Sequence, residues 1–80
     1  MIPLYGFLEG DTIGLLVLAE RDDSIGQIAR KLQAAARLRV AIDGPVDVIH
    51  GGKTLDPQST VADNALQPLA RIDVRRGTPA

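Results

Sequence analysis

The residues that could perform chemistry are few and lie apart in the sequence. Ser24 and Ser59 are candidate nucleophiles, and His50 is the single histidine of the chain. Nucleophilic catalysis needs a base held beside the nucleophile, and neither serine has one near it in sequence. We therefore interpret His50 as a surface residue at the end of a strand. No catalytic residue is predicted, and the chain is expected to be no enzyme by itself.

Phosphate and metal sites are not predicted either. Gly51-Gly52-Lys53 has residue types found in phosphate-binding loops, but such a loop is longer and opens a helix, whereas a strand pattern follows here. We interpret this segment as a turn. The alternating spacing of a calcium loop is absent around Asp22, Asp23, Asp43 and Asp47. With no cysteine and one histidine, neither a disulfide nor a zinc site is expected. We predict no cofactor, no metal and no small-molecule substrate.

Composition narrows the class of protein further. A chain of 80 residues that is 45% hydrophobic suits a single domain with one core. Its net charge of −1, with Tyr5 and Phe7 as the two aromatic residues, argues against nucleic acid as a partner. The first basic residue is Arg21, and the longest apolar run, residues 15–19, is too short to span a membrane. We expect a cytoplasmic protein.

Hydrophobic periodicity predicts a β-hairpin followed by a helix. Residues 2–8 and 12–19 are rich in apolar and β-branched types, with turn residues between them. Ser24 and Gln27 have the spacing of a capping box, which marks a helix start. Three- and four-residue spacing then predicts one buried stripe, made by Ile25, Ile28, Ala29, Leu32, Ala35 and Ala36.

The second half of the chain predicts three shorter strands. Residues 46–50 and 71–75 alternate apolar and polar types, and residues 53–55 follow the turn at Gly51-Gly52. Thr60 and Asp63 repeat the capping-box spacing over a one-turn helix. The course of residues 37–45 is not assigned. This order predicts an α+β fold, with a mixed four- to five-stranded sheet and one helix packed on one face. A single domain is expected over residues 1–77, with residues 78–80 as a frayed tail.

Both faces of the second strand are apolar. Leu15 and Val17 point to one side, and Leu16 and Leu18 point to the other, where a minimal core does not explain them. Uncovered leucines on an edge strand favour association with another chain. Alternatively, the connector at residues 38–42 folds over them. Both interpretations remain open at this stage.

The chain resembles ubiquitin over most of its length. The similar segments are Ser24-Ile25 to Lys31-Leu32, Val48-Ile49-His50-Gly51-Gly52-Lys53-Thr54-Leu55, and Arg75-Arg76-Gly77. This resemblance implies a β-grasp fold. It does not imply conjugation, because a modifier ends in Gly-Gly and here Gly77 is followed by Thr78-Pro79-Ala80. Ubiquitin's apolar recognition patch would keep Ile49, but Arg75 stands at the matching position of the last strand.

The first half more closely resembles the protein B family of bacterial multicomponent toluene monooxygenases. The similar residues are Ile2-Pro3, Glu9, Asp11, Leu15, Asp23-Ser24, Gln27, Ala29 and Lys31. The resemblance implies a ubiquitin-like γ subunit of a diiron hydroxylase, which contacts and stabilises the large catalytic α subunit and holds neither iron nor substrate. Guided by the apolar excess, we predict the contact residues to be Pro3, Tyr5, Phe7, Leu16 and Leu18.

Two other functions belong to different classes. One is a stand-alone bacterial ubiquitin-like regulatory protein, of the kind seen beside type VII secretion genes. The other is a sulfur carrier or modifier, which ranks last because trimming to Gly77 would leave a single terminal glycine after Arg76.

Overall fold

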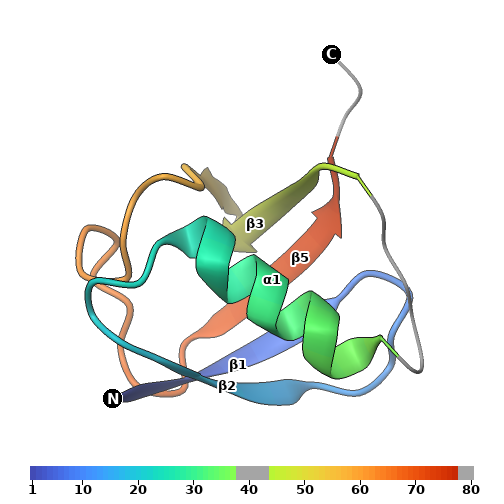
Figure 1. Ribbon diagram of the computed structural model, residues 1–80, viewed down its shortest axis with the longest axis horizontal. Coiled ribbons are helices and arrows are strands. Elements are labelled where there is room, and N and C mark those ends of the chain that lie inside the picture. The colour runs from blue at the N-terminus through green and yellow to red at the C-terminus, as the bar shows by residue number, and fades with distance from the viewer. Residues whose placement is uncertain (38–43, 78–80) are drawn as a thin grey trace.

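The computed structural model describes residues 1–37 and 44–77, which form a sheet with a helix lying across one face (Figure 1). The elements in chain order are β1 (Ile2–Leu8), β2 (Leu15–Ala19), α1 (Ile25–Ala36), β3 (Val46–His50), β4 (Lys53–Leu55) and β5 (Arg71–Arg76). The strand order is β2-β1-β5-β3-β4. Strands β1 and β5 run parallel, and the other neighbours run antiparallel. The predicted α+β fold, with one helix packed on a mixed sheet, is confirmed.

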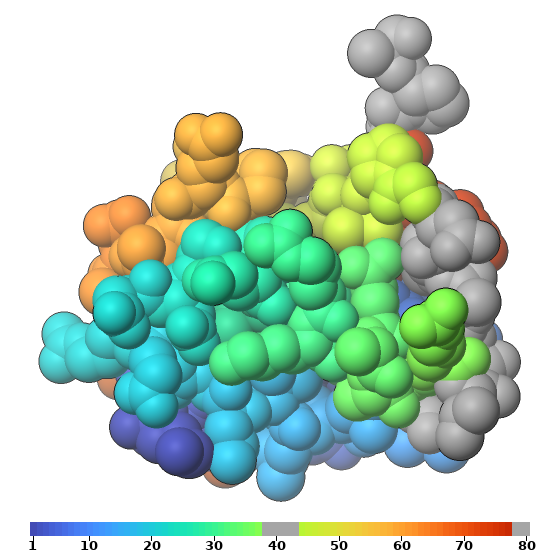
Figure 2. Space-filling model, viewed as in Figure 1, coloured from blue at the N-terminus to red at the C-terminus, as the bar shows by residue number. Residues whose placement is uncertain are grey.

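The core lies between α1 and the inner face of the sheet. Strand periodicity sends alternate side chains inward, so Leu4 and Leu8 of β1, and Ile72 and Val74 of β5, are buried. The helix contributes its apolar stripe, in which Ile25, Ile28, Ala29, Leu32 and Ala36 are buried. Ala35 was also predicted in this stripe, but it is exposed, because it lies on the polar flank of the helix. Seen from the helix side, α1 covers much of the sheet (Figure 2).

Gly6 of β1 lies directly against the Leu32 side chain of the helix. A Cβ atom on Gly6 would lie 2.9 Å from both terminal methyl carbons of Leu32, which is itself fully buried. Real Cβ atoms do not make contacts that short, so a side chain at this position would push Leu32 out of its site. The absence of a side chain on Gly6 therefore leaves the space that the end of the Leu32 side chain fills.

The predicted capping box at the start of α1 is confirmed. Ser24 Oγ accepts a hydrogen bond from the Gln27 amide at 3.1 Å, and Gln27 Oε1 accepts one from the Ser24 amide at 2.7 Å. Asp23, the residue before the cap, accepts from the Glu20 amide at 2.8 Å and from Lys31 Nζ at 3.1 Å. The Glu20 amide first, and then Lys31, hold the pKa of the Asp23 carboxyl below its ordinary value of 3.8.

Strand β2 begins at Leu15, three residues later than predicted. Asp11 accounts for the difference, because its Oδ1 accepts a hydrogen bond from the Ile13 amide at 3.1 Å. This bond to the backbone two residues on holds the segment in a turn and removes it from the strand. The apolar type of Ile13 suggested a strand, but its side chain is 51% exposed.

The second capping-box spacing produces turns instead of the predicted one-turn helix. Its two reciprocal bonds do form, since the Thr60 amide donates to Asp63 Oδ2 and the Asp63 amide donates to Thr60 Oγ1, both at 3.0 Å. Residues 61–65 then form hydrogen-bonded turns. Ala65 has a φ of 50°, a left-handed conformation that cannot continue a right-handed helix.

The turn predicted at Gly51-Gly52 is confirmed, with φ values of 59° and 78°. Strand β5 ends one residue later than predicted, at Arg76. Two other predictions concern residues outside the described part of the chain. These are the connector at 38–42 as a cover for Leu16 and Leu18, and the frayed tail at 78–80.

We predict that Gly6 and Leu32 are energetically coupled. Leu32→Ala should lower the free energy of unfolding by about 2–5 kcal/mol, because it leaves a cavity in the core. Gly6→Ala should lower it by about 1–3 kcal/mol, because the added methyl group overpacks against Leu32. In the Leu32→Ala background the same methyl group has room, so Gly6→Ala should there be close to neutral. Urea unfolding of the four proteins measures this coupling. Additive effects would contradict the close approach.

We predict that Asp23 makes stability depend on pH in the acid range. Its pKa is lowered in the folded state, so its contribution is fully present above the unfolded value near 3.8 and is lost as pH falls through the folded pKa. Wild type should therefore lose its advantage over Asp23→Asn as the pH drops below about 4. Denaturant unfolding of both proteins across this range tests the prediction. A stability difference that does not change with pH would contradict it.

Candidate functional site

The outer face of the sheet, opposite α1, carries the residues predicted to bind a partner. In β1 the inward positions are Leu4, Gly6 and Leu8, so Pro3, Tyr5 and Phe7 point outward. Strand register then aligns the second strand with them. Leu18 pairs with Pro3, and Leu16 pairs with Tyr5. The five predicted residues therefore lie together, and we call them the outer-face patch: Pro3, Tyr5, Phe7, Leu16 and Leu18.

Three residues of the outer-face patch are exposed, and the other two, Pro3 and Phe7, are half-buried. Leu16 is 63% exposed, Leu18 is 55% exposed and Tyr5 is 42% exposed. Neighbouring Val17 and Ala19 on β2 are buried under α1, which shows that the strand is apolar on both faces as expected. Clustered, exposed large hydrophobic side chains of this kind mark interaction surfaces more often than scattered ones do.

Pro3 fits within the sheet because its missing amide hydrogen is not needed there. The Tyr5 amide donates to Ala70 O at 2.9 Å, and the Leu69 amide donates to Pro3 O. The backbone groups of Pro3 and Tyr5 therefore point toward the β5 side, and their pairs with β2 are the non-hydrogen-bonded ones. Pairing between β1 and β5 begins at Tyr5 and Arg71, so Pro3 precedes it. The proline nitrogen therefore removes no hydrogen bond between these two strands.

The two aromatic rings of the chain stack in the middle of the patch. Tyr5 and Phe7 have ring centroids 5.0 Å apart and planes inclined by 4°. A Cβ atom on Gly14 would lie 2.0 Å from Tyr5 Cε1 and 2.8 Å from Phe7 Cζ, so the rings pack over this glycine. Gly14 does not have a positive φ, so glycine is needed at this position because a side chain would overlap the two rings. The space left by the missing side chain is filled by the stacked rings of Tyr5 and Phe7.

A charged pair on β5 completes this cluster. The guanidinium carbon of Arg71 lies 4.1 Å from the centroid of the Phe7 ring, a cation–π contact. The same guanidinium donates to Asp73 through Nε at 3.3 Å and a terminal nitrogen at 3.1 Å. This two-point pairing fixes Arg71 over the ring and balances its charge. The patch thus borders an ion pair that is already satisfied within the chain.

Sequence reasoning missed Gly14, Arg71 and Asp73. Alternation in the last strand could have placed Arg71 and Asp73 on one face, since Ile72 and Val74 are the buried residues between them. The sequence did not show which strand lies beside β5. In the structure β5 pairs in parallel with β1, and this pairing aligns Asp73 with Phe7. No local signal distinguishes Gly14 from a glycine that serves a turn.

The remaining outer face is polar except at Ile49. Register aligns Ile49 with Asp73, and Asp47 with Arg75. Ile49 is half-buried, and Arg75 is exposed. A charged side chain therefore stands beside the isoleucine that corresponds to ubiquitin's recognition patch, and the exposed apolar surface lies on β1 and β2 instead.

His50 is held in a structural hydrogen bond. Its Nδ1 lies 2.8 Å from the carbonyl oxygen of Arg71, and because a carbonyl only accepts, the ring donates from this nitrogen. Within residues 1–37 and 44–77, no group of three or more His, Cys, Asp or Glu side chains could hold a metal ion. The described residues thus do not form a site for iron.

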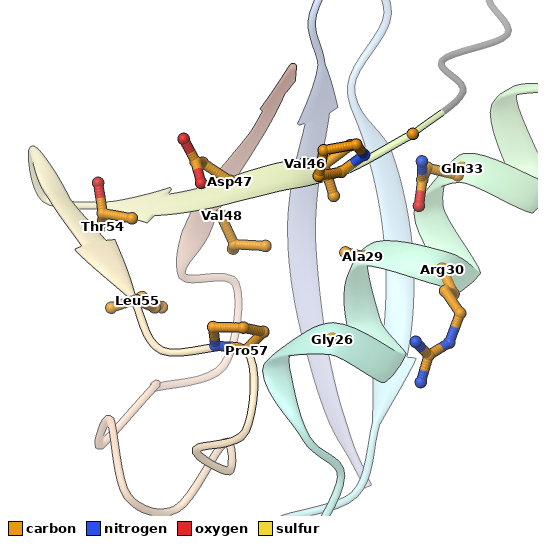
Figure 3. Close-up of a pocket in the computed structure, with 12 residues that line it drawn as sticks. Gly26, Ala29, Arg30, Gln33, Val46, Asp47, Val48, Thr54, Leu55 and Pro57 are labelled. Carbon is orange, nitrogen blue, oxygen red and sulfur yellow. The ribbon is translucent and has the colours of Figure 1, made fainter. Parts of the chain in front are cut away.

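A pocket of about 400 Å³ lies on the opposite side of the sheet, between α1 and the β3–β4 pair (Figure 3). Val48 points into it, whereas Asp47 and Thr54 point to the other side of their strands. Arg30 and Gln33 contribute from the helix. Among the described residues that line it, Thr54 and Asp47 are the groups that could act as a nucleophile or base, and both point away from the pocket. The pocket therefore does not suggest catalysis.

Comparison with solved structures identifies the fold. An archaeal ubiquitin from Caldiarchaeum subterraneum is 12% identical, with a TM-score of 0.76, and the match covers 99% of this chain and 96% of that one. A structure described as molecular mimicry of SUMO is 15% identical, with a TM-score of 0.76, covering 91% of this chain and 88% of that one. These similarities show the ubiquitin-like β-grasp fold. No helix within the described residues is long and apolar enough to cross a membrane.

A third solved structure is more similar in sequence. A chain from the toluene 4-monooxygenase HD complex with the inhibitor 4-bromobenzoate is 28% identical, with a TM-score of 0.87. The match covers 95% of this chain and 98% of that one. No curated protein sequence matches. The family model for toluene-4-monooxygenase system protein B (TmoB) matches residues 1–75, nearly the whole chain. Because this match spans residues 1–75, the chain belongs to the toluene-4-monooxygenase system protein B family and is a component of a monooxygenase system.

Proposed function

We propose that this chain is the non-catalytic γ subunit of a multicomponent diiron hydroxylase that oxidises aromatic or alkene substrates. In this proposal the outer-face patch binds the large α subunit and stabilises it. The observation that carries the proposal is the alignment of five apolar residues on the sheet face opposite α1, in a chain of this family. The similar chain in a toluene 4-monooxygenase complex supports it. The binding unit is residues 1–77, acting as a single domain.

The physical basis of binding is the removal of apolar surface from water. The backbone of Leu16, Leu18 and Tyr5 is already ordered in the sheet, so a partner that covers them orders their side chains alone. Tyr5 and Phe7 provide rigid aromatic surface, the kind that anchors many interfaces. Arg71 reaches the interface already paired with Asp73, which limits the cost of taking its charge out of water.

Iron, oxygen and hydrocarbon would all belong to the partner. The described residues of this chain form no metal site, and His50 is hydrogen-bonded to the backbone carbonyl of Arg71. The work of this chain would be to hold the α subunit in its assembled state. Binding to the folded partner stabilises it by mass action, by an amount that grows with the logarithm of the ratio of the subunit's concentration to its dissociation constant. No particular observation favours a stand-alone regulatory role.

We predict that Leu16→Asp combined with Leu18→Asp abolishes stable association with the hydroxylase. Charges at these two exposed positions would have to be buried against the partner, so affinity should fall at least about 30-fold, or about 2 kcal/mol. Co-expression with the neighbouring large subunits, followed by size exclusion and calorimetry, measures the effect. Circular dichroism should show an intact fold, because neither side chain lies in the core.

Gln58→Asp combined with Ala34→Glu is the matched control. It changes the net charge by the same amount at one exposed loop position and one exposed helix position away from the patch, and it should bind as wild type does. Equal binding by the leucine variant and wild type would remove the patch from the proposal. A wild-type chain that always elutes alone would overturn the subunit role itself.

We predict that Gly14→Ala weakens hydroxylase binding about 10-fold by displacing the aromatic stack. The new methyl group would overlap Tyr5 Cε1, so the Tyr5 ring must rotate away while the fold is kept. Ring-current shifts in NMR spectra report the stack, and calorimetry reports the affinity. In a Tyr5→Ala background the same substitution should cost little further affinity. A full additional loss there would show that Gly14 acts by another route.

A further inference from the structure

Strand β2 lies at one edge of the sheet, and within residues 1–37 and 44–77 no strand pairs with its outer side. Strand β2 is the longer of the two edge strands, with five residues against three in β4. Because the pairs of Pro3 with Leu18 and of Tyr5 with Leu16 are the non-hydrogen-bonded ones, the amides and carbonyls of Leu16 and Leu18 point away from β1. These outward groups are a template on which another strand could pair.

One of those groups is covered by a lysine from the helix. Lys31 Nζ donates to the Leu18 carbonyl oxygen at 3.1 Å and at the same time to Asp23 Oδ2 at 3.1 Å. Asp23 is itself anchored by the Glu20 amide. The ammonium group is therefore held at the edge by two acceptors, one of which is fixed to the backbone before the helix. A strongly hydrated charge at this place obstructs an incoming strand.

A second copy of this chain has the complementary edge. If two β2 strands paired antiparallel about a two-fold axis at Val17, Leu16 of one copy would face Leu18 of the other. Both residues have outward amides and carbonyls, so each such pair could exchange two hydrogen bonds. Their side chains would also meet, giving four leucines on one continuous outer face. Such pairing needs the Leu18 carbonyl as an acceptor, and in the described structure this carbonyl already accepts a hydrogen bond from Lys31.

We propose that Lys31, held by Asp23, is an edge guard that keeps the free subunit from pairing β2 with β2 of a second copy. The guard leaves the outer face of Leu16 and Leu18 open while it closes the edge beside them. The same two leucines can therefore remain available to a partner without causing self-association. This inference concerns the isolated chain and does not depend on the proposed hydroxylase contact.

The test compares Lys31→Met with wild type by sedimentation at increasing protein concentration. Methionine keeps the length and helix preference of the side chain but removes its charge and its donor. Lys31→Met should shift to twice the monomer mass at concentrations where wild type stays monomeric. Lys31→Arg is the matched control, because it retains a positive donor, and it should stay monomeric. Lys31→Ala serves as a second unguarded variant if Lys31→Met does not fold.

Amide exchange identifies the surface that pairs. In the dimer of the unguarded variant, the amides of Leu16 and Leu18 should exchange at least about 10-fold more slowly than in the monomer, because they become hydrogen-bonded. A dimer without this protection would mean association through the sheet face and would overturn the proposal. Folded Lys31→Met and Lys31→Ala proteins that stay monomeric would overturn it as well. So would a wild-type chain that already dimerises through β2. None of these outcomes involves the hydroxylase, so each is distinguishable from failure of the subunit role.

Discussion

The packing of α1 against β1 is the constraint on which the other surfaces depend. Leu32 is fully buried, and its terminal methyl groups occupy the space that a side chain on Gly6 would need. Once this contact is made, one face of every strand is committed to the core. Because side chains alternate with a period of two, a slip of one residue would exchange the inner and outer sets. The outer-face patch exists because this contact selects which side of β1 and β2 is buried.

The parallel pairing of β1 with β5 gives the outer face its chemical character. It brings the first and last strands of the chain together, and it aligns Tyr5 with Arg71 and Phe7 with Asp73. The apolar surface therefore ends at an ion pair in place of continuing across the sheet. Beyond that pair, Arg75 and Asp47 make the face polar. The chain shares the ubiquitin-like fold, yet its exposed apolar surface lies toward the opposite edge from Ile49.

Lys31 connects three parts of the structure that sequence separates. It lies on the polar flank of α1, it pairs with Asp23 before the helix, and it reaches the carbonyl of Leu18 on the edge strand. The ion pair is partly exposed, so its Coulomb contribution to stability is modest. Its position is more informative than its strength. The charge at the edge of β2 opposes pairing with another strand, whereas the apolar residues on the outer face of β2 remain able to bind a partner.

Local patterns in the sequence determined most of the elements and the family. Two features follow from interactions between residues close in sequence: the capping box of Ser24 and Gln27, and the turn at Gly51 and Gly52. The two apolar faces of β2 follow directly from the residue types along the strand. The errors were local as well, since Asp11 and Ala65 adopt turn conformations that override the patterns around them. The five patch residues could be predicted because strand alternation and apolar excess are visible in one dimension.

Tertiary structure alone decided which distant residues meet. The position of Arg71 over Phe7, of Gly14 beneath Tyr5, and of Lys31 at Leu18 depends on strand order and register. Many registers satisfy the same alternation, and the packing of the whole core selects one of them. For this reason the sequence by itself indicated an apolar surface and its family, while the three-dimensional fold determined how that surface is organised and how its edge is closed.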